Sequence, residues 1–213
     1  KTPLGERGLI ARLTPLLSHE SAPLRFPVVI ILKNLVIDNA RNATEFVELD
    51  GPALLARLFE ESYHDGSKFE SARALVSLLR LRNADVTRAV LAVGGAYAML
   101  AELLASKHAV LRNEVVAAAS LFLDKEAVSD DARGRLLEAF APHMANVLDQ
   151  DEDAGKIGLL GFVLAASQGS GESIERAKKA MRETGAVEVV ERAAKSGNAA
   201  VAQRAQAVLK EYA

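Results

Sequence analysis

Residues 83–95 read NADVTRAVLAVGG, and residues 99–104 continue as MLAELL. The apolar residues in both segments recur at spacings of three and four, which is the period of an amphipathic helix. Asn83 offers a side-chain acceptor for the free amides at a helix start, and Gly94 and Gly95 suit a helix end. The pattern therefore predicts a short helix, a corner marked by glycine and a second helix.

The glycine-led pattern repeats along the chain. Gly8 and Gly51 are 43 residues apart, Gly51 and Gly95 are 44 apart, and Gly95 and Gly185 are 90 apart, or two periods of about 45. The missing member is expected near residue 140, where FAPHM opens an apolar run, with Pro142 suited to a first helical turn. The chain thus holds five units of the length found in helical solenoids. At each corner we expect glycine to adopt a positive φ, which it does at little cost.

Each unit divides into three helical pieces, and no stretch shows a sustained alternation of apolar and polar residues. The short first helices are expected at 43–50, 85–93, 130–140 and 174–184, after the capping residues Asn42, Asn83, Ser129 and Ser173. The longer third helices are expected at 22–38, 67–82, 109–125, 154–168 and 198–213. The chain is therefore predicted to be all-α.

These segments resemble the armadillo repeat, in which a short helix ends in a glycine pair and is followed by a leucine-rich second helix and a longer third one. Residues 43–125 match best, residues 8–38 resemble the second and third helices of a preceding repeat, and residues 126–213 match more loosely, with a HEAT-like repeat as the alternative there. The resemblance implies a right-handed α-solenoid of about five repeats in one domain over residues 1–213, with partial terminal repeats. The approximate repeats are 1–42, 43–83, 84–128, 129–172 and 173–213.

The resemblance also implies that the third helices line a concave groove, and that the protein is a non-catalytic scaffold or adaptor binding a peptide or a partner protein. A chaperone cofactor or a regulator of an ATPase or GTPase is the alternative function. The family's groove often carries Trp and Asn four residues apart, but here Ile30 precedes Asn34, and the next repeats carry Arg73 with Ser77 and Val116 with Ser120. This departure argues against recognition of basic nuclear localisation signals.

A step of 43 residues relates the third helices to one another, and residues four apart share a helix face. The step predicts a protein-binding groove of three stripes: Phe26, Ile30, Asn34, Phe69, Arg73, Ser77, Arg112, Val116 and Ser120. Such a surface suits a peptide with hydrophobic anchors and some acidic character. The alternative is that Phe26 and Phe69 pack between repeats while the charged side chains are merely solvated.

Three histidines, His19, His64 and His108, fall in the turns between second and third helices. Packed helices lie about 10 Å apart, whereas zinc ligands lie about 2 Å from their ion, so we predict turn or capping roles and no shared metal site. The acidic residues at 149–153 lack the glycine and final glutamate of a calcium loop, which favours a solvated turn that caps the helix near Ala154.

No catalytic or cofactor motif is present in the sequence. Gly155, Gly158 and Gly161 lie on a helix and not after a strand, so they favour close helix packing and not a dinucleotide loop. The G-x-S-x-G, P-loop and H-E-x-x-H patterns are absent. We therefore predict no catalytic residues, no metal and no cofactor.

The composition of the chain excludes several classes of partner and site. Hydrophobic residues make up 50% of the 213 residues, which indicates a folded protein, and the net charge of −2 without tryptophan argues against a nucleic-acid partner, including damaged DNA. The absence of cysteine excludes disulfides and thiolate sites. The aliphatic run 28–32 ends at Lys33, far short of a membrane span. We expect a cytoplasmic fragment of a larger protein, whose uncapped apolar end is compatible with self-association.

Overall fold

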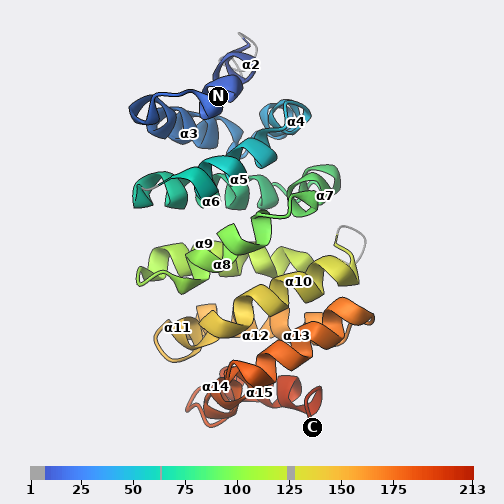
Figure 1. The fold of residues 1–213 in the computed structure, drawn as a ribbon. Helices are drawn as coiled ribbons and strands as arrows, with labels where there is room; N and C mark the ends of the chain where they lie inside the picture. The colour runs from blue at the N-terminus through green and yellow to red at the C-terminus, as the bar shows by residue number, and fades with distance from the viewer. Residues whose placement is uncertain (1–7, 63, 124–127) are drawn as a thin grey trace. The chain divides into compact units, whose positions relative to one another are not determined.

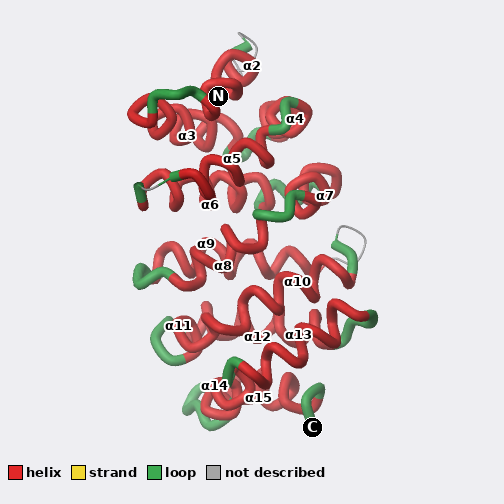
Figure 2. The backbone as a smooth tube through the Cα atoms, viewed as in Figure 1, coloured by secondary structure: helices red, strands yellow, loops and turns green. Residues whose placement is uncertain are grey.

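The computed structural model describes residues 8–62, 64–123 and 128–213, without the side chains of residues 122 and 123. Within these ranges every regular element is a helix, and no strand occurs (Figure 2). The chain divides into two compact units, Lys1–Leu103 and Leu104–Ala213. The prediction of all-α architecture is confirmed.

The first unit, called unit 1 below, is built around two long helices. Its elements are α2 (Leu9–Leu13), η1 (Thr14–Ser18), α3 (Ala22–Val36), α4 (Ala40–Glu48), α5 (Gly51–Glu61), α6 (Asp65–Leu79), α7 (Ala84–Ala92) and most of α8 (Ala96–Ala105). Helices α3 and α6 lie side by side, and α5 packs against α6 (Figure 1). Completely buried side chains such as Leu32, Leu55 and Leu75 fill the space between these helices.

The second unit, called unit 2 below, repeats this arrangement. After the end of α8 it contains α9 (Ala109–Ala119), η2 (Ser120–Leu123), α10 (Asp130–Phe140), η3 (Ala141–His143), α11 (Met144–Leu148), α12 (Asp153–Ser167), α13 (Glu172–Glu183), α14 (Ala186–Ala193) and α15 (Ala199–Lys210). Helix α12 packs between α9 and α15, and α10 lies against α13 (Figure 1). Phe140 and Phe162 meet edge to face in the core, with ring centroids 5.6 Å apart.

The three-helix order predicted for each repeat is present and continues to Lys210. First helices are α4, α7, α10 and α13, and third helices are α3, α6, α9, α12 and α15. Helix α9 ends at Ala119 and passes into the 3-10 turn η2, while its predicted end at Lys125 lies outside the described residues. The single solenoid domain over residues 1–213 stays a prediction.

Two of the four predicted helix caps are confirmed. The side chain of Asn83 accepts from the amides of Asp85 and Val86, and that of Ser129 accepts from Ala132. Helix α4, however, begins earlier than predicted, because Asn39 is its N-cap. Asn42 lies buried inside the helix, where its side-chain Nδ2 donates to the carbonyl oxygen of Leu35 at 2.9 Å. The prediction for Ser173 is likewise wrong, since α13 has Gly171 as its N-cap.

The corner glycines serve two different purposes. Gly8 and Gly185 have the predicted positive φ, at 69° and 73°. At the corner before α5, Asp50 takes the positive φ instead, so the prediction for Gly51 is wrong, as it is for Gly95. Gly51 is required for close packing, because a Cβ there would lie 2.5 Å from the Phe46 ring.

No described helix is, by itself, both long and apolar enough to cross a membrane. Within the described ranges, α7 and α8 taken together are the one pair that meets the length and composition requirement, and they are bent by 92° where they meet. Both helices carry residues of the buried core, among them Val90 and Leu100.

Candidate functional site

The predicted stripe residues of unit 1 occupy matching positions on two neighbouring helices. The N-caps of α3 and α6, Ser21 and His64, are 43 residues apart, so the predicted step is correct here. Asn34 is exposed, and the other five residues are half-buried: Phe26, Ile30, Phe69, Arg73 and Ser77. We call these six residues the α3–α6 face. Its role in binding stays a prediction.

An ion network joins the two helices beside this face. The Lys33 ammonium forms an ion pair with one Glu70 carboxylate oxygen, and the Arg73 guanidinium donates to the other at 2.8 Å. The side chains of Lys33 and Glu70 are only 11% and 16% exposed, whereas that of Arg73 is 29% exposed. Two cations surround one carboxylate, so the network adds net positive charge to the α3–α6 face.

The pKa of Glu70 reflects this setting. Burial by itself would raise the pKa of the carboxyl, but the hydrogen bonds and the charges of Lys33 and Arg73 outweigh burial and hold the pKa below its ordinary value. A lowered folded-state pKa means that the carboxylate stabilises the protein above the unfolded-state pKa. This stabilisation is lost as the pH falls through the folded-state value.

Glu70→Gln is therefore expected to lower the free energy of unfolding at neutral pH by about 1 kcal/mol, the typical contribution of a hydrogen bond, here partly exposed. The difference from the wild type should shrink as the pH falls below the ordinary pKa of a glutamate and through the lowered pKa of Glu70. Urea denaturation of both proteins across this pH range measures the difference. A difference that stays constant with pH would show that the Glu70 charge is not the stabilising feature.

In unit 2 the predicted step is wrong by one residue. The N-cap of α9 is His108, which lies 44 residues after His64. Arg112, Val116 and Ser120 therefore match Lys68, Ala72 and Val76, and not the α3–α6 face. A shift of one residue turns a helical position by about 100°. Accordingly Arg112 and Val116 are buried, at 3% and 4% exposure, and Ser120 is half-buried.

The positions of α9 that do match the α3–α6 face are Asn113, Ala117 and Leu121. The first two are exposed, and Leu121 is half-buried. Sequence reasoning missed them because the step of 43 residues was carried on to a repeat that is 44 residues long, as the spacing from Gly51 to Gly95 shows. The N-cap histidines, His64 and His108, give the same signal, since their spacing is also 44 residues.

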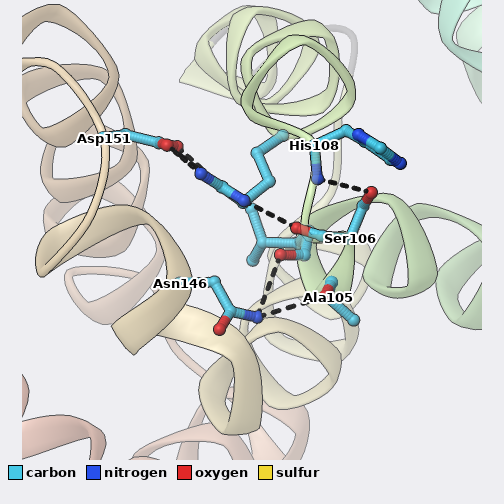
Figure 3. A network of polar contacts seen from close by, with 7 residues as sticks. Ala105, Ser106, His108, Asn146 and Asp151 are labelled. Carbon is cyan, nitrogen blue, oxygen red and sulfur yellow. Dashed lines mark hydrogen bonds and ion pairs between the residues drawn. The ribbon is translucent and has the colours of Figure 1, made fainter.

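Arg112 takes part in a buried polar network (Figure 3). Its Nε donates to Asp151 at 2.9 Å, and its Nη1 donates to the carbonyl oxygen of Ser106 at 2.7 Å. These hydrogen bonds to Asp151 raise the pKa of Arg112 further, so the guanidinium stays charged. Nearby, Asn146 Nδ2 donates to the carbonyl oxygens of Leu104 and Ala105 at 3.3 and 3.4 Å (Figure 3). Arg112 therefore links the turn before α9 to the turn before α12, and its charge is paired within the protein and does not face a ligand.

The acidic turn before α12 agrees with the prediction only in part: Asp149, Glu152 and Asp153 are exposed, but the N-cap Glu152 makes no side-chain capping hydrogen bond. Asp151 is not solvated, since its side chain is 1% exposed. Asp149 pairs with Arg192 at 2.7 Å, and Asp153 accepts from Asn198 at 2.8 Å. The turn therefore links neighbouring repeats within unit 2. No group of His, Asp or Glu side chains in the described part of the chain could hold a metal ion.

A hollow of about 300 Å³ lies between α9 and α12, formed by Asn113, Val116, Ala117, Ser120, Glu152, Ala154, Gly155 and Gly158. The glycines allow close approach: a Cβ at Gly158 would lie 2.9 Å from the Val116 side chain, and one at Gly161 would lie 2.9 Å from Arg204. The predicted packing role of these glycines is confirmed.

All three histidines lie in the predicted turns, and the side chains of two of them accept a backbone hydrogen bond there. His19 Nδ1 accepts from the amide of Ser21 at 3.0 Å, and His64 Nδ1 accepts from that of Ser67 at 3.2 Å. His108 is the N-cap of α9, but its side chain makes no capping hydrogen bond. The first two imidazoles therefore stabilise the turns that lead into third helices.

Comparison with known proteins identifies the fold. No protein-family model and no curated protein sequence matches the chain. Among solved structures, a designed armadillo repeat protein in complex with the peptide (KR)4 is 19% identical, with a TM-score of 0.70 over 100% of this chain and 85% of that chain. A computationally designed armadillo repeat protein for modular peptide recognition is 19% identical, with a TM-score of 0.73 over the same shares.

A natural protein also has a structure similar to that of this chain. The armadillo repeats only protein of Plasmodium falciparum is 13% identical, with a TM-score of 0.72 over 100% of this chain and 95% of that chain. At such low identity the likeness concerns the fold alone. The chain therefore has the armadillo-repeat fold, as its resemblance to that repeat implied.

Proposed function

We propose that this protein is a non-catalytic interaction scaffold or adaptor that binds a peptide or a peptide-like segment of a partner protein. The α3–α6 face supports the proposal, because two half-buried phenylalanines, Ile30, Arg73 and the exposed amide of Asn34 lie on adjacent third helices. Apolar groups supply contact area, and an amide can pair with the backbone of an extended chain. The fold is shared with armadillo repeat proteins designed for modular peptide recognition.

We further propose that the ligand is acidic and apolar. Lys33 and Arg73 surround the single carboxylate of Glu70, so the α3–α6 face has an excess of positive charge. The peptide in the structure of the designed relative, (KR)4, is basic. Positive charge on the α3–α6 face disfavours such a ligand and favours an acidic one, because like charges brought together cost free energy.

Fluorescence anisotropy with labelled (EL)4 and (KL)4 peptides tests the proposal. We expect (EL)4 to bind at least about tenfold more tightly than (KL)4, and its affinity to fall as salt is added. Asn34→Glu places a negative charge on the α3–α6 face at an exposed position and should weaken (EL)4 binding about tenfold.

Ala53→Glu is the matched control, because it adds the same single negative charge at a residue that is exposed on α5 and does not belong to the α3–α6 face. Circular dichroism should show that both variants keep the helical content of the wild type. Equal binding of (EL)4 and (KL)4 would contradict the proposed ligand. Equal losses in the two variants would contradict the proposed surface.

A further inference from the structure

A cavity of about 350 Å³ lies in unit 1 where the start of α3, the end of α5 and the start of α6 meet. Its wall is mostly apolar and includes Ala22, Pro23, Phe26 and Leu58. The charged residues at its edge are Arg25 and Glu61. The volume lies near the lower end of the range for ligand pockets, about 300–1,000 Å³, and suits one bulky side chain with its flanking backbone.

The apolar wall of the cavity is fixed in place before any ligand arrives. Leu58 is 2% exposed and belongs to the core. The Phe26 ring meets the His64 imidazole edge to face, with ring centroids 5.3 Å apart. His64 is itself held by the hydrogen bond that it accepts from the Ser67 amide at 3.2 Å. A preformed wall binds an apolar side chain without the entropic cost of ordering its own side chains.

The charge at the cavity points to an anionic neighbour for that side chain. Arg25 Nη1 contacts a Glu61 carboxylate oxygen at 3.3 Å, whereas Arg25 Nε is buried and has no acceptor among the described residues. The buried Nε is out of reach of a ligand, so a second carboxylate would share the Nη groups with Glu61. Glu61 is 54% exposed, so its side chain can turn toward solvent when another carboxylate arrives.

Helix geometry strengthens this charge preference. Helices α3 and α6 are each 15 residues long. Their first turns border the cavity through Ala22, Pro23 and Ser67. The N-terminus of a helix carries a partial positive charge. In α3 the N-cap Ser21 makes no side-chain hydrogen bond to the first amides. A carboxylate beside the cavity would therefore meet Arg25 and this helix start together.

We infer that this cavity is the anchor pocket for a peptide segment in which a bulky apolar residue adjoins an acidic one. The inference rests on the proposed peptide-binding function and extends it. Phe26 belongs both to the cavity wall and to the α3–α6 face, so one extended peptide can occupy both. The apolar side chain fills the cavity, and the neighbouring carboxylate contacts Arg25.

The probe is the peptide Ac-GSLESG-NH2, with Ac-GSAESG-NH2 and Ac-GSLQSG-NH2 as matched peptides. Titration of the isotope-labelled full chain, followed by amide chemical shifts, reports where each peptide binds and how tightly. We expect shifts at Ala22, Ser62 and Ser67, and about tenfold weaker binding of either matched peptide.

Two variants test the pocket itself. Ala22→Phe fills the cavity from an exposed helix-start position, and Arg25→Gln removes the cation; each should weaken the Leu-Glu peptide about tenfold. Ala53→Phe and Arg57→Gln are the matched controls, because both residues are exposed on α5 and do not line the cavity. We expect them to bind as the wild type does.

The outcomes separate this inference from the proposed function. Shifts at Asn34 and Arg73 without shifts at the cavity would overturn the anchor pocket and leave the α3–α6 face standing. If the Leu-Glu peptide causes shifts at the cavity but binds Arg25→Gln as tightly as it binds the wild type, the assignment of the acidic neighbour would be overturned. No shifts at either place, together with no binding of (EL)4, would overturn both.

Discussion

Asp151→Ala is expected to lower the free energy of unfolding by about 3–5 kcal/mol, because it leaves a buried guanidinium without its counter-charge. Arg112 is 3% exposed, and its hydrogen bonds go to Asp151 and the Ser106 carbonyl. The loss should appear as an earlier transition in urea denaturation followed by circular dichroism. Hydrogen exchange should assign the loss to unit 2, which contains all three residues.

Two further variants separate burial from charge pairing as such. Asp149→Ala removes an ion pair with Arg192 in which both side chains are at least 40% exposed, and we expect a much smaller effect. Replacing Arg112 and Asp151 together by leucine should restore most of the lost stability, because no buried charge then remains. If Asp151→Ala and Asp149→Ala were equally mild, the buried pair would not be the contact that secures this turn.

Gly134→Ala is expected to lower the free energy of unfolding by about 2–3 kcal/mol. Gly134 lies in α10, where a Cβ would stand 2.6 Å from the carbonyl carbon of Ser173 and 2.8 Å from Ile174 N. Backbone atoms cannot rotate away as a side chain can, so α13 would have to move. This cost exceeds the gain of about 1 kcal/mol that alanine brings to a helix interior.

Gly94→Ala is the matched control for this prediction. A Cβ at Gly94 would meet no atom within 4 Å, and its φ is not positive. The change should leave stability unaltered or raise it slightly, because alanine restricts the unfolded chain. A thermal melt of both variants provides the comparison. Equal melting temperatures for the two would show that α10 and α13 are less tightly packed than the structure indicates.

The matching positions of the α3–α6 face could be predicted from the sequence because the starts of α3 and α6 are separated by the predicted step. Ser21 and His64 are 43 residues apart, so one step relates Phe26 to Phe69 and Asn34 to Ser77. The next spacing, His64 to His108, is one residue longer, and two of the three predicted residues on α9, Arg112 and Val116, are therefore buried. Each repeat length counts separately in such a chain, because a single residue turns the helix by about 100°.

The sequence by itself determined the helices, their three-part grouping and an average repeat of about 45 residues, since amphipathic spacing and caps such as Asn83 and Ser129 act within a few residues. Only the tertiary structure decided that Asp151 is buried against Arg112 and that Gly51 faces the Phe46 ring. It also decided that Arg25 borders a cavity. The physical reason is that burial and close approach are properties of packed neighbours, and two of these three sites join residues more than 30 positions apart in the chain.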